Sequence, residues 1–109
     1  MSDLLSKKCI PCEGGMDPLT KEEAGKYLSQ VEGWNMTEGG KKISKEFKFQ
    51  DFIGAVDFVN RVADVAEMEG HHPDIEIHYN KVKITNWTHA IGGLSENDFI
   101  LAAKIDAHN

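Results

Sequence analysis

The hydrophobic period of this chain changes repeatedly along its length, and that change constrains the fold more than any other feature. Residues 43–49 and 75–85 largely alternate apolar with polar side chains, which is typical of strands with one buried face. Between them, apolar residues recur at three- and four-residue steps, as on one face of an amphipathic helix. The chain therefore predicts strands on both sides of one long central helix.

Three helices are expected, and local signals mark their ends. Thr20 and Glu23 have the spacing of a capping box, which opens the first helix, and Ser95 and Asp98 repeat that spacing before the last one. Gly70 ends the central helix, because glycine enters the left-handed conformation at little cost. The core-facing line of this central helix is expected to consist of Phe52, Val56, Val59, Ala63 and Ala66.

Two hairpins supply the strands. A short strand over residues 34–37 returns through the Gly39-Gly40 turn, and the second hairpin is expected to turn at Asn80-Lys81. Helices that interrupt hairpin pairs favour an antiparallel sheet, because a parallel sheet needs single strands alternating with crossovers. The predicted fold class is α+β: a four-stranded antiparallel sheet with three helices on one face, in the order α-β-β-α-β-β-α.

A chain of 109 residues has room for one domain, which we place at residues 19–109. Residues 1–18 contain Pro11 and glycines without any periodicity, and they predict a flexible leader. Cys9 and Cys12 form a lone C-x-x-C within it. A second cysteine pair, which a four-ligand zinc site requires, is missing, so the pair is interpreted as part of the tail, with metal or redox chemistry as the alternative.

Charge and hydropathy narrow the classes of partner. A formal net charge of -6 repels phosphate backbones, so direct nucleic-acid binding is not expected. The sequence has no apolar run near the ~20 residues of a membrane span and no secretory signal core, so we expect a cytoplasmic protein without membrane contact.

The last helix is apolar over more than one stripe, with Phe99, Ile100, Leu101 and Ile105 among its residues. One sheet face covers only part of such a helix. The remaining apolar residues indicate either a subunit interface or a helix that lies deep in a small core.

Three histidines are the candidate catalytic residues. His71 and His72 follow the central helix directly, and His89 lies just beyond the second hairpin. Histidine gives and takes protons near neutral pH, which an elimination of water requires at two positions. A three-histidine zinc site is the rival interpretation. Neighbouring residues in extended chain point to opposite sides, so His71 and His72 are badly placed to share one ion, and we expect no metal.

The spacing of these residues resembles a known signature, that of the pterin-4a-carbinolamine dehydratase family. The similarity covers residues 19–106, and its fixed positions are Glu67, His71, His72, Pro73, Tyr79, His89 and Asp98. The resemblance implies dehydration of 4a-hydroxytetrahydrobiopterin, or a related 4a-hydroxy pterin, to quinonoid dihydropterin and water. This reaction recycles the pterin cofactor of aromatic amino-acid hydroxylases and needs no metal or organic cofactor. It also implies a homodimer or homotetramer.

Carried over by position, His71 and His89 become the acid/base pair, while His72 chiefly holds the pterin. The resemblance further makes Glu67 an orienting or ring-binding carboxylate and Asp98 a support for His89, although capping alone also explains Asp98. Trp34 either closes one side of the pocket or packs in the core.

A second function is open to such a chain. Some members of the family bind a transcription regulator or assist the assembly of another enzyme, with little or no catalysis. The three histidines favour the enzyme, and fold alone does not decide, because function resides in the site.

Overall fold

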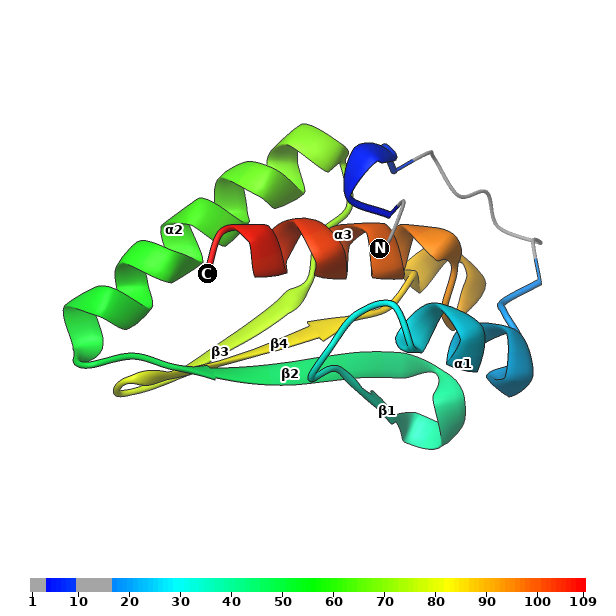
Figure 1. Cartoon of the computed structure of the whole chain (residues 1–109), viewed down its shortest axis with the longest axis horizontal. Coiled ribbons are helices and arrows are strands. Elements are labelled where there is room, and N and C mark those ends of the chain that lie inside the picture. Colours follow the sequence, from blue (N-terminus) through cyan, green and yellow to red (C-terminus); the bar gives the residue numbers. More distant parts are fainter. Residues whose placement is uncertain (1–3, 10–16) are drawn as a thin grey trace.

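The structure, a computed structural model, describes residues 4–9 and 17–109 of the chain. Its elements are α1 (Lys21–Leu28), β1 (Asn35–Thr37), β2 (Lys42–Lys48), α2 (Phe52–Glu69), β3 (Asp74–His78), β4 (Lys81–Asn86) and α3 (Glu96–Ala107). Their order confirms the predicted α-β-β-α-β-β-α arrangement (Figure 1). Within the described part of the chain, no helix is both long and apolar enough to cross a membrane.

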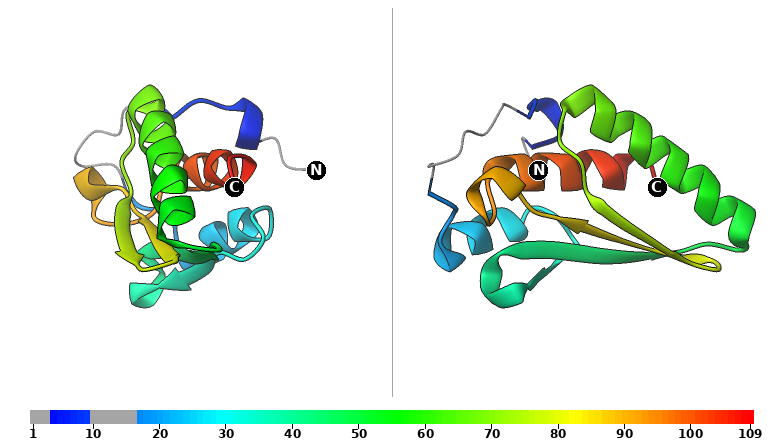
Figure 2. Two further views of the ribbon diagram at one scale, coloured as in Figure 1. Left: turned by 90° about the vertical axis from the view of Figure 1, so that its left-hand side faces the viewer. Right: turned by 180° about the vertical axis from the view of Figure 1, so that it is seen from behind.

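The four strands form one antiparallel sheet in the order β1-β2-β4-β3. The long connection through α2 places β3 at an edge, so that β4 returns between β3 and β2. All three helices lie on one side of this sheet, and its other side is left open (Figure 2). This arrangement confirms the predicted α+β class.

The core lies between the sheet and the helices. Inward-facing residues of β2 and β4 meet the buried sides of α2 and α3 there. Buried residues of this core include Ile43, Phe47, Phe58, Val62, Val82, Ile84, Phe99 and Leu101. The rings of Phe47 and Phe58 lie 4.7 Å apart between centroids, which ties the end of β2 to the first half of α2.

The core-facing line of α2 differs from the predicted one. Ala55, Phe58, Val62 and Val65 are buried, whereas Phe52 at the helix start is 49% exposed. Of the predicted line, Ala66 alone is buried. The helix carries apolar residues on two neighbouring lines, and one residue of offset rotates a helix face by about 100°. Period alone did not identify the line that faces the sheet.

The apolar surplus of α3 is covered within the chain. Every residue from Asn97 to Ala102 is buried, as is Ile105. The sheet, α2 and a 3₁₀ turn at Leu4–Ser6 surround the helix, and Leu4 is 1% exposed. Of the two interpretations of this helix, burial in a small core is the one that the structure supports.

Residues 4–9 of the predicted flexible leader are packed on the domain. Leu4 joins the core, Lys7 pairs with Glu96 at 2.8 Å, and the Cys9 N–H donates to Glu69 at 3.0 Å. The expectation of a flexible leader is therefore wrong for these residues, because a leucine docked in an apolar gap outweighs the lack of periodicity around it. Cys12 lies outside the described residues, so the C-x-x-C interpretation stays a prediction.

Candidate active site

The three predicted histidines come from two segments that meet at one end of the sheet. His71 and His72 precede β3, which begins at Asp74, while His89 follows β4, which ends at Asn86. Since these two strands pair antiparallel, the start of one lies beside the end of the other. Gly70 (φ 66°) closes α2 in the left-handed conformation and turns the chain into this junction.

His71 contacts a buried carboxylate. Its Nε2 lies 2.6 Å from Oδ1 of Asp98, which is fully buried at the start of α3. The other oxygen, Oδ2, accepts hydrogen bonds from Thr88 Oγ1 (2.8 Å) and from the Ser95 N–H (2.9 Å). Charge-assisted bonds of this kind are short and orient both partners. The ring of His71 is thus fixed through Nε2, and Nδ1 is the nitrogen left for chemistry.

Asp98 thereby has a different partner from the expected one. The capping box with Ser95 forms as predicted. The imidazole that Asp98 supports is that of His71, however, and its link to His89 runs only through Thr88, the preceding residue. The carboxylate lies between the two histidine segments: Oδ1 contacts His71, and Oδ2 accepts a hydrogen bond from Thr88, next to His89. This pairing corrects the role that the resemblance implied.

His89 packs against the indole of Trp87 in a tilted arrangement. Its ring lies 3.9 Å from that of Trp87 between centroids, at an interplanar angle of 34°. Trp87 in turn donates from Nε1 to Asp74 Oδ2 (3.2 Å), and Lys42 Nζ lies 4.6 Å from the indole centroid. Trp87 therefore joins the His89 segment to the start of β3, directly after the other two histidines.

His72 contacts Glu67 through Nε2 and Oε2, and both side chains are exposed. The resemblance implied that Glu67 is an orienting or ring-binding carboxylate, and it stands four residues before His71. The Gly70 turn instead brings it to His72, while His71 reaches Asp98. The adjacent histidines thus have different carboxylate partners, and among residues 4–9 and 17–109 no group of three or more His, Cys, Asp or Glu could hold a metal ion.

Trp34 lies in the core and not in this site. It is 4% exposed, packs edge-on against Phe47, and donates from Nε1 to both oxygens of Asp106 (3.2 and 3.1 Å). Asp106 stands eight residues after Asp98 on α3, roughly 12 Å along the helix axis. Of the two alternatives for Trp34, closing the pocket or packing in the core, the structure supports packing in the core.

A polar hollow of about 240 Å³ lies on the open side of the sheet and shares Asp74 and Lys42 with the Trp87 contacts. Hydroxyl-bearing and charged side chains from all four strands and from the turn after β1 line the rest of it, among them Thr85. These groups offer both donors and acceptors, which suits a polar ring better than an apolar ligand.

Three residues of this network were missed as site residues. Thr88 and Ser95 share the buried carboxylate, and their hydroxyl oxygens lie 2.8 Å apart. Trp87 carried a usable signal, because residues two apart in extended chain share a face, which places its ring beside that of His89. The grouping of Thr88 and Ser95 around Asp98 depends on tertiary contacts, and no local pattern predicts it.

Comparisons with known proteins agree with this arrangement. The model of the family described as "Pterin 4 alpha carbinolamine dehydratase" matches residues 17–108. A protein of Nitrosospira multiformis named "Putative pterin-4-alpha-carbinolamine dehydratase" is 53% identical over 106 residues, 97% of this chain and 92% of that protein. A protein of the same name from Rickettsia canadensis is 48% identical over 108 residues, 98% of each chain.

Solved structures give the same family relationship. The crystal structure of a "transcriptional coactivator/pterin dehydratase" from Brucella melitensis has a TM-score of 0.79 and 36% identity, covering 84% of this chain and 98% of that one. A pterin dehydratase-like protein described as a RuBisCO assembly factor in the alpha-carboxysome has a TM-score of 0.61 and 25% identity, covering 70% and 88%. The shared fold, the matched residues 17–108 and the extent of identity lead to one conclusion: this chain belongs to the pterin-4a-carbinolamine dehydratase family.

Proposed function

We propose that this protein removes water from 4a-hydroxytetrahydrobiopterin, or a related 4a-hydroxy pterin, to give quinonoid dihydropterin for re-use by aromatic amino-acid hydroxylases. The observation that carries the proposal is the His71–Asp98 pair, whose carboxylate is fully buried and connected through Thr88 to the second histidine segment. A histidine oriented by a carboxylate is a common form of general acid or base. Family membership supplies the substrate class.

The reaction requires one proton to be given and one to be taken. The C4a–O bond breaks as the hydroxyl oxygen gains a proton and leaves as water, and a ring N–H loses its proton so that its electron pair forms the C=N bond. We assign these transfers to His71, whose ring bonds to Asp98, and to His89, whose ring packs against Trp87. His72, held by Glu67 at the exposed rim, binds the pterin ring. The chemistry needs no metal and no organic cofactor.

Purified protein tests this proposal directly. It should accelerate dehydration of a 4a-hydroxy pterin well above the uncatalysed rate, and exhaustive chelation should leave that rate unchanged. A rate equal to the background would refute the enzyme, and activity lost on chelation and restored by zinc alone would refute the metal-free mechanism.

A second candidate function is stabilisation of a partner oligomer. The assembly factor among the structural relatives supports it, as do exposed apolar side chains on α2, where Ile53 is 65% and Met68 is 78% exposed. The two functions differ in what they need: catalysis needs the histidines, whereas partner binding needs the α2 surface. A protein without dehydratase activity that still retains a partner oligomer in a pull-down would support this second function.

We also propose that the protein is a homodimer or homotetramer. An open four-stranded sheet has two unpaired edges, here β1 and β3, and α2 exposes apolar side chains. Light scattering at micromolar concentration should report two or four copies, and a persistent monomer would contradict this.

A further inference from the structure

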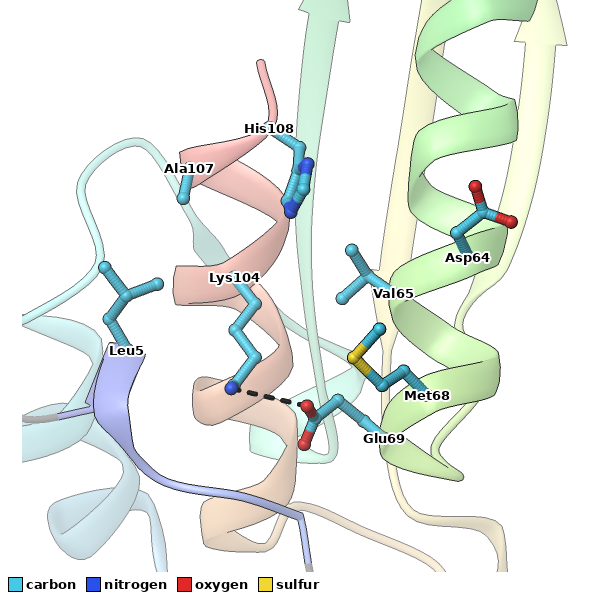
Figure 3. Close-up of a pocket in the computed structure, with 8 residues that line it drawn as sticks. All are labelled: Leu5, Asp64, Val65, Met68, Glu69, Lys104, Ala107 and His108. Carbon is cyan, nitrogen blue, oxygen red and sulfur yellow. Dashed lines mark ion pairs between the residues drawn. The ribbon is translucent and has the colours of Figure 1, made fainter.

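Glu69, the last residue of α2, has a buried carboxylate that the proposed chemistry does not use. Its side chain is 4% exposed. Oε1 accepts a hydrogen bond from the Cys9 N–H at 3.0 Å, and Oε2 pairs with Lys104 Nζ at 3.3 Å. Figure 3 shows Lys104 extending from α3 toward Glu69 on α2.

This carboxylate is charged at neutral pH. Burial on its own would raise the pKa of Glu69, but the bonds from the Cys9 N–H and Lys104 outweigh it and hold the pKa below its ordinary value. A buried charge is costly unless it is paired, so the position of Glu69 is restricted to where both partners reach it.

The partners of Glu69 connect it to the helix that carries Asp98. Lys104 is on α3, six residues or roughly 9 Å after Asp98. Cys9 also donates from Sγ to the carbonyl of Asn97, the residue before Asp98, at 3.6 Å. Cys9 thus contacts the end of α2 and the start of α3, the two segments from which His71 and Asp98 extend.

The leader holds Cys9 in place. Leu4 is buried against α3, and Lys7 pairs with Glu96 in the first turn of that helix at 2.8 Å. Glu96 also accepts a hydrogen bond from Tyr27 of α1 at 3.1 Å. The Cys9 N–H that donates to Glu69 therefore lies in a segment that is packed on the domain.

We propose that Glu69 is a positioning residue for the dehydration, which ties the end of α2 to α3 and to the leader so that His71 stays on Asp98. Gly70 is the only residue between Glu69 and His71, and the His71 N–H donates to the Ala66 carbonyl in the last turn of α2 at 3.2 Å, so a shift of the end of α2 moves His71 with it. This inference rests on the proposed dehydratase function.

The expected effect lies in kcat. A displacement of about 1 Å in a catalytic group can cost up to about 100-fold in rate. We expect Glu69→Gln to lower kcat by about 10- to 100-fold and to leave KM within about threefold, because Glu69 does not touch the substrate. Gln keeps the size of the side chain and an acceptor for Cys9, but it leaves Lys104 unpaired.

Lys104→Met should reproduce the effect, and Lys45→Met is the matched control. Lys45 pairs with Asp106 at the far end of α3 at 3.0 Å, and its side chain is 22% exposed against 18% for Lys104. The control should therefore lose similar stability while keeping kcat. Glu69→Gln combined with Lys104→Met should be no worse than either single change, because both break the same contact.

The second readout is independent of activity. Nitrogen-15 NMR of the imidazole rings reports whether Nε2 of His71 remains hydrogen-bonded to Asp98. We expect its resonances to shift in Glu69→Gln and Lys104→Met but not in Lys45→Met. Unchanged His71 signals in the first two variants, or an equal loss of kcat in all three, would overturn the inference. If the wild type shows no dehydration, the proposed function fails, and the NMR comparison still decides whether Glu69 positions His71.

Discussion

Replacing Asp98 by asparagine changes the state of His71 without changing the shape of the side chain. Oδ2 of Asp98 receives two donors, from Thr88 and from Ser95, whereas Oδ1 faces a single nitrogen of His71. In the Asp98→Asn variant the amide oxygen satisfies the two donors best, so the NH₂ group points at Nε2 of His71. Since two donors cannot bond each other, the neutral imidazole must move its proton to Nδ1.

The contacts of Asp98 give the expected loss of folding stability in the Asp98→Asn variant. A hydrogen bond to a charged group is worth about 1.5–3 kcal/mol against about 0.5–1.5 kcal/mol for a neutral one, and all three bonds of this carboxylate become neutral. We expect the free energy of unfolding to fall by about 2–3 kcal/mol. A protonated Nδ1 no longer accepts a proton, so kcat should fall by about 10² to 10⁴-fold. In serine proteases the equivalent Asp-to-Asn change costs about 10⁴ through the same tautomer effect.

Urea unfolding, which gives the free energy of unfolding, and steady-state kinetics, which give kcat, together test this prediction. Asp106→Asn is the matched control, since Asp106 is an α3 aspartate that accepts from Trp34 and Lys45 away from the histidines. The control should lose stability and keep kcat. If Asp98→Asn is folded and keeps kcat within about threefold of wild type, Asp98 merely caps α3 and the assigned tautomer is wrong.

Three further predictions concern the leader, the stacked ring and pH. Leu4→Ala should lower the free energy of unfolding by about 2 kcal/mol, which is at the low end for buried leucines because this terminal segment relaxes easily. The control Leu5→Ala should change it by less than about 0.5 kcal/mol, because Leu5 is 51% exposed. Equal losses in urea unfolding would mean that residues 4–9 are not docked through Leu4. Trp87→Ala should lower kcat because His89 loses its aromatic partner, while Trp87→Phe should keep most of the wild-type kcat. Equal kcat values for the two variants would exclude the ring contact as the cause. The pKa of Glu69 lies below its ordinary 4.5, so its contribution to the free energy of unfolding is complete above pH 4.5 and is lost as the pH falls through the lower folded-state pKa. In Glu69→Gln the free energy of unfolding should therefore fall less steeply with decreasing acid pH than in the wild type, and an unchanged slope would contradict this.

Local signals predicted the helix starts and the fold class. The Thr20–Glu23 capping box opens α1, with the Glu23 N–H donating to Thr20 Oγ1 at 3.1 Å, and Gly70 ends α2 as expected. These features depend on residues a few positions apart, which a sequence displays directly. The second turn is offset by one residue, since Tyr79 and Asn80 form it and Tyr79 takes φ 53°, a conformation rare for a tyrosine.

Contacts between distant segments were not predictable in this way. The three histidines could be chosen from residue type and spacing, but the partner of each was assigned incorrectly or not at all. Asp98 bonds His71 across 27 residues, and the leader reaches Glu69 across 60. Such pairings depend on how α2, α3 and the sheet pack, and hydrophobic period leaves that packing undetermined, as the offset of the α2 line shows.

The central claim is that His71 and His89 act together as acid and base, and the kcat values of their alanine variants test it most directly. After correction for uncatalysed dehydration, His71→Ala and His89→Ala should each lose about 10² to 10⁴-fold in kcat, and the double variant should lose little more than the worse single one. His72→Ala should instead raise KM with kcat nearly unchanged, because it binds ground and transition states alike. If both single variants are folded by circular dichroism and keep near-wild-type kcat, the acid/base assignment is wrong.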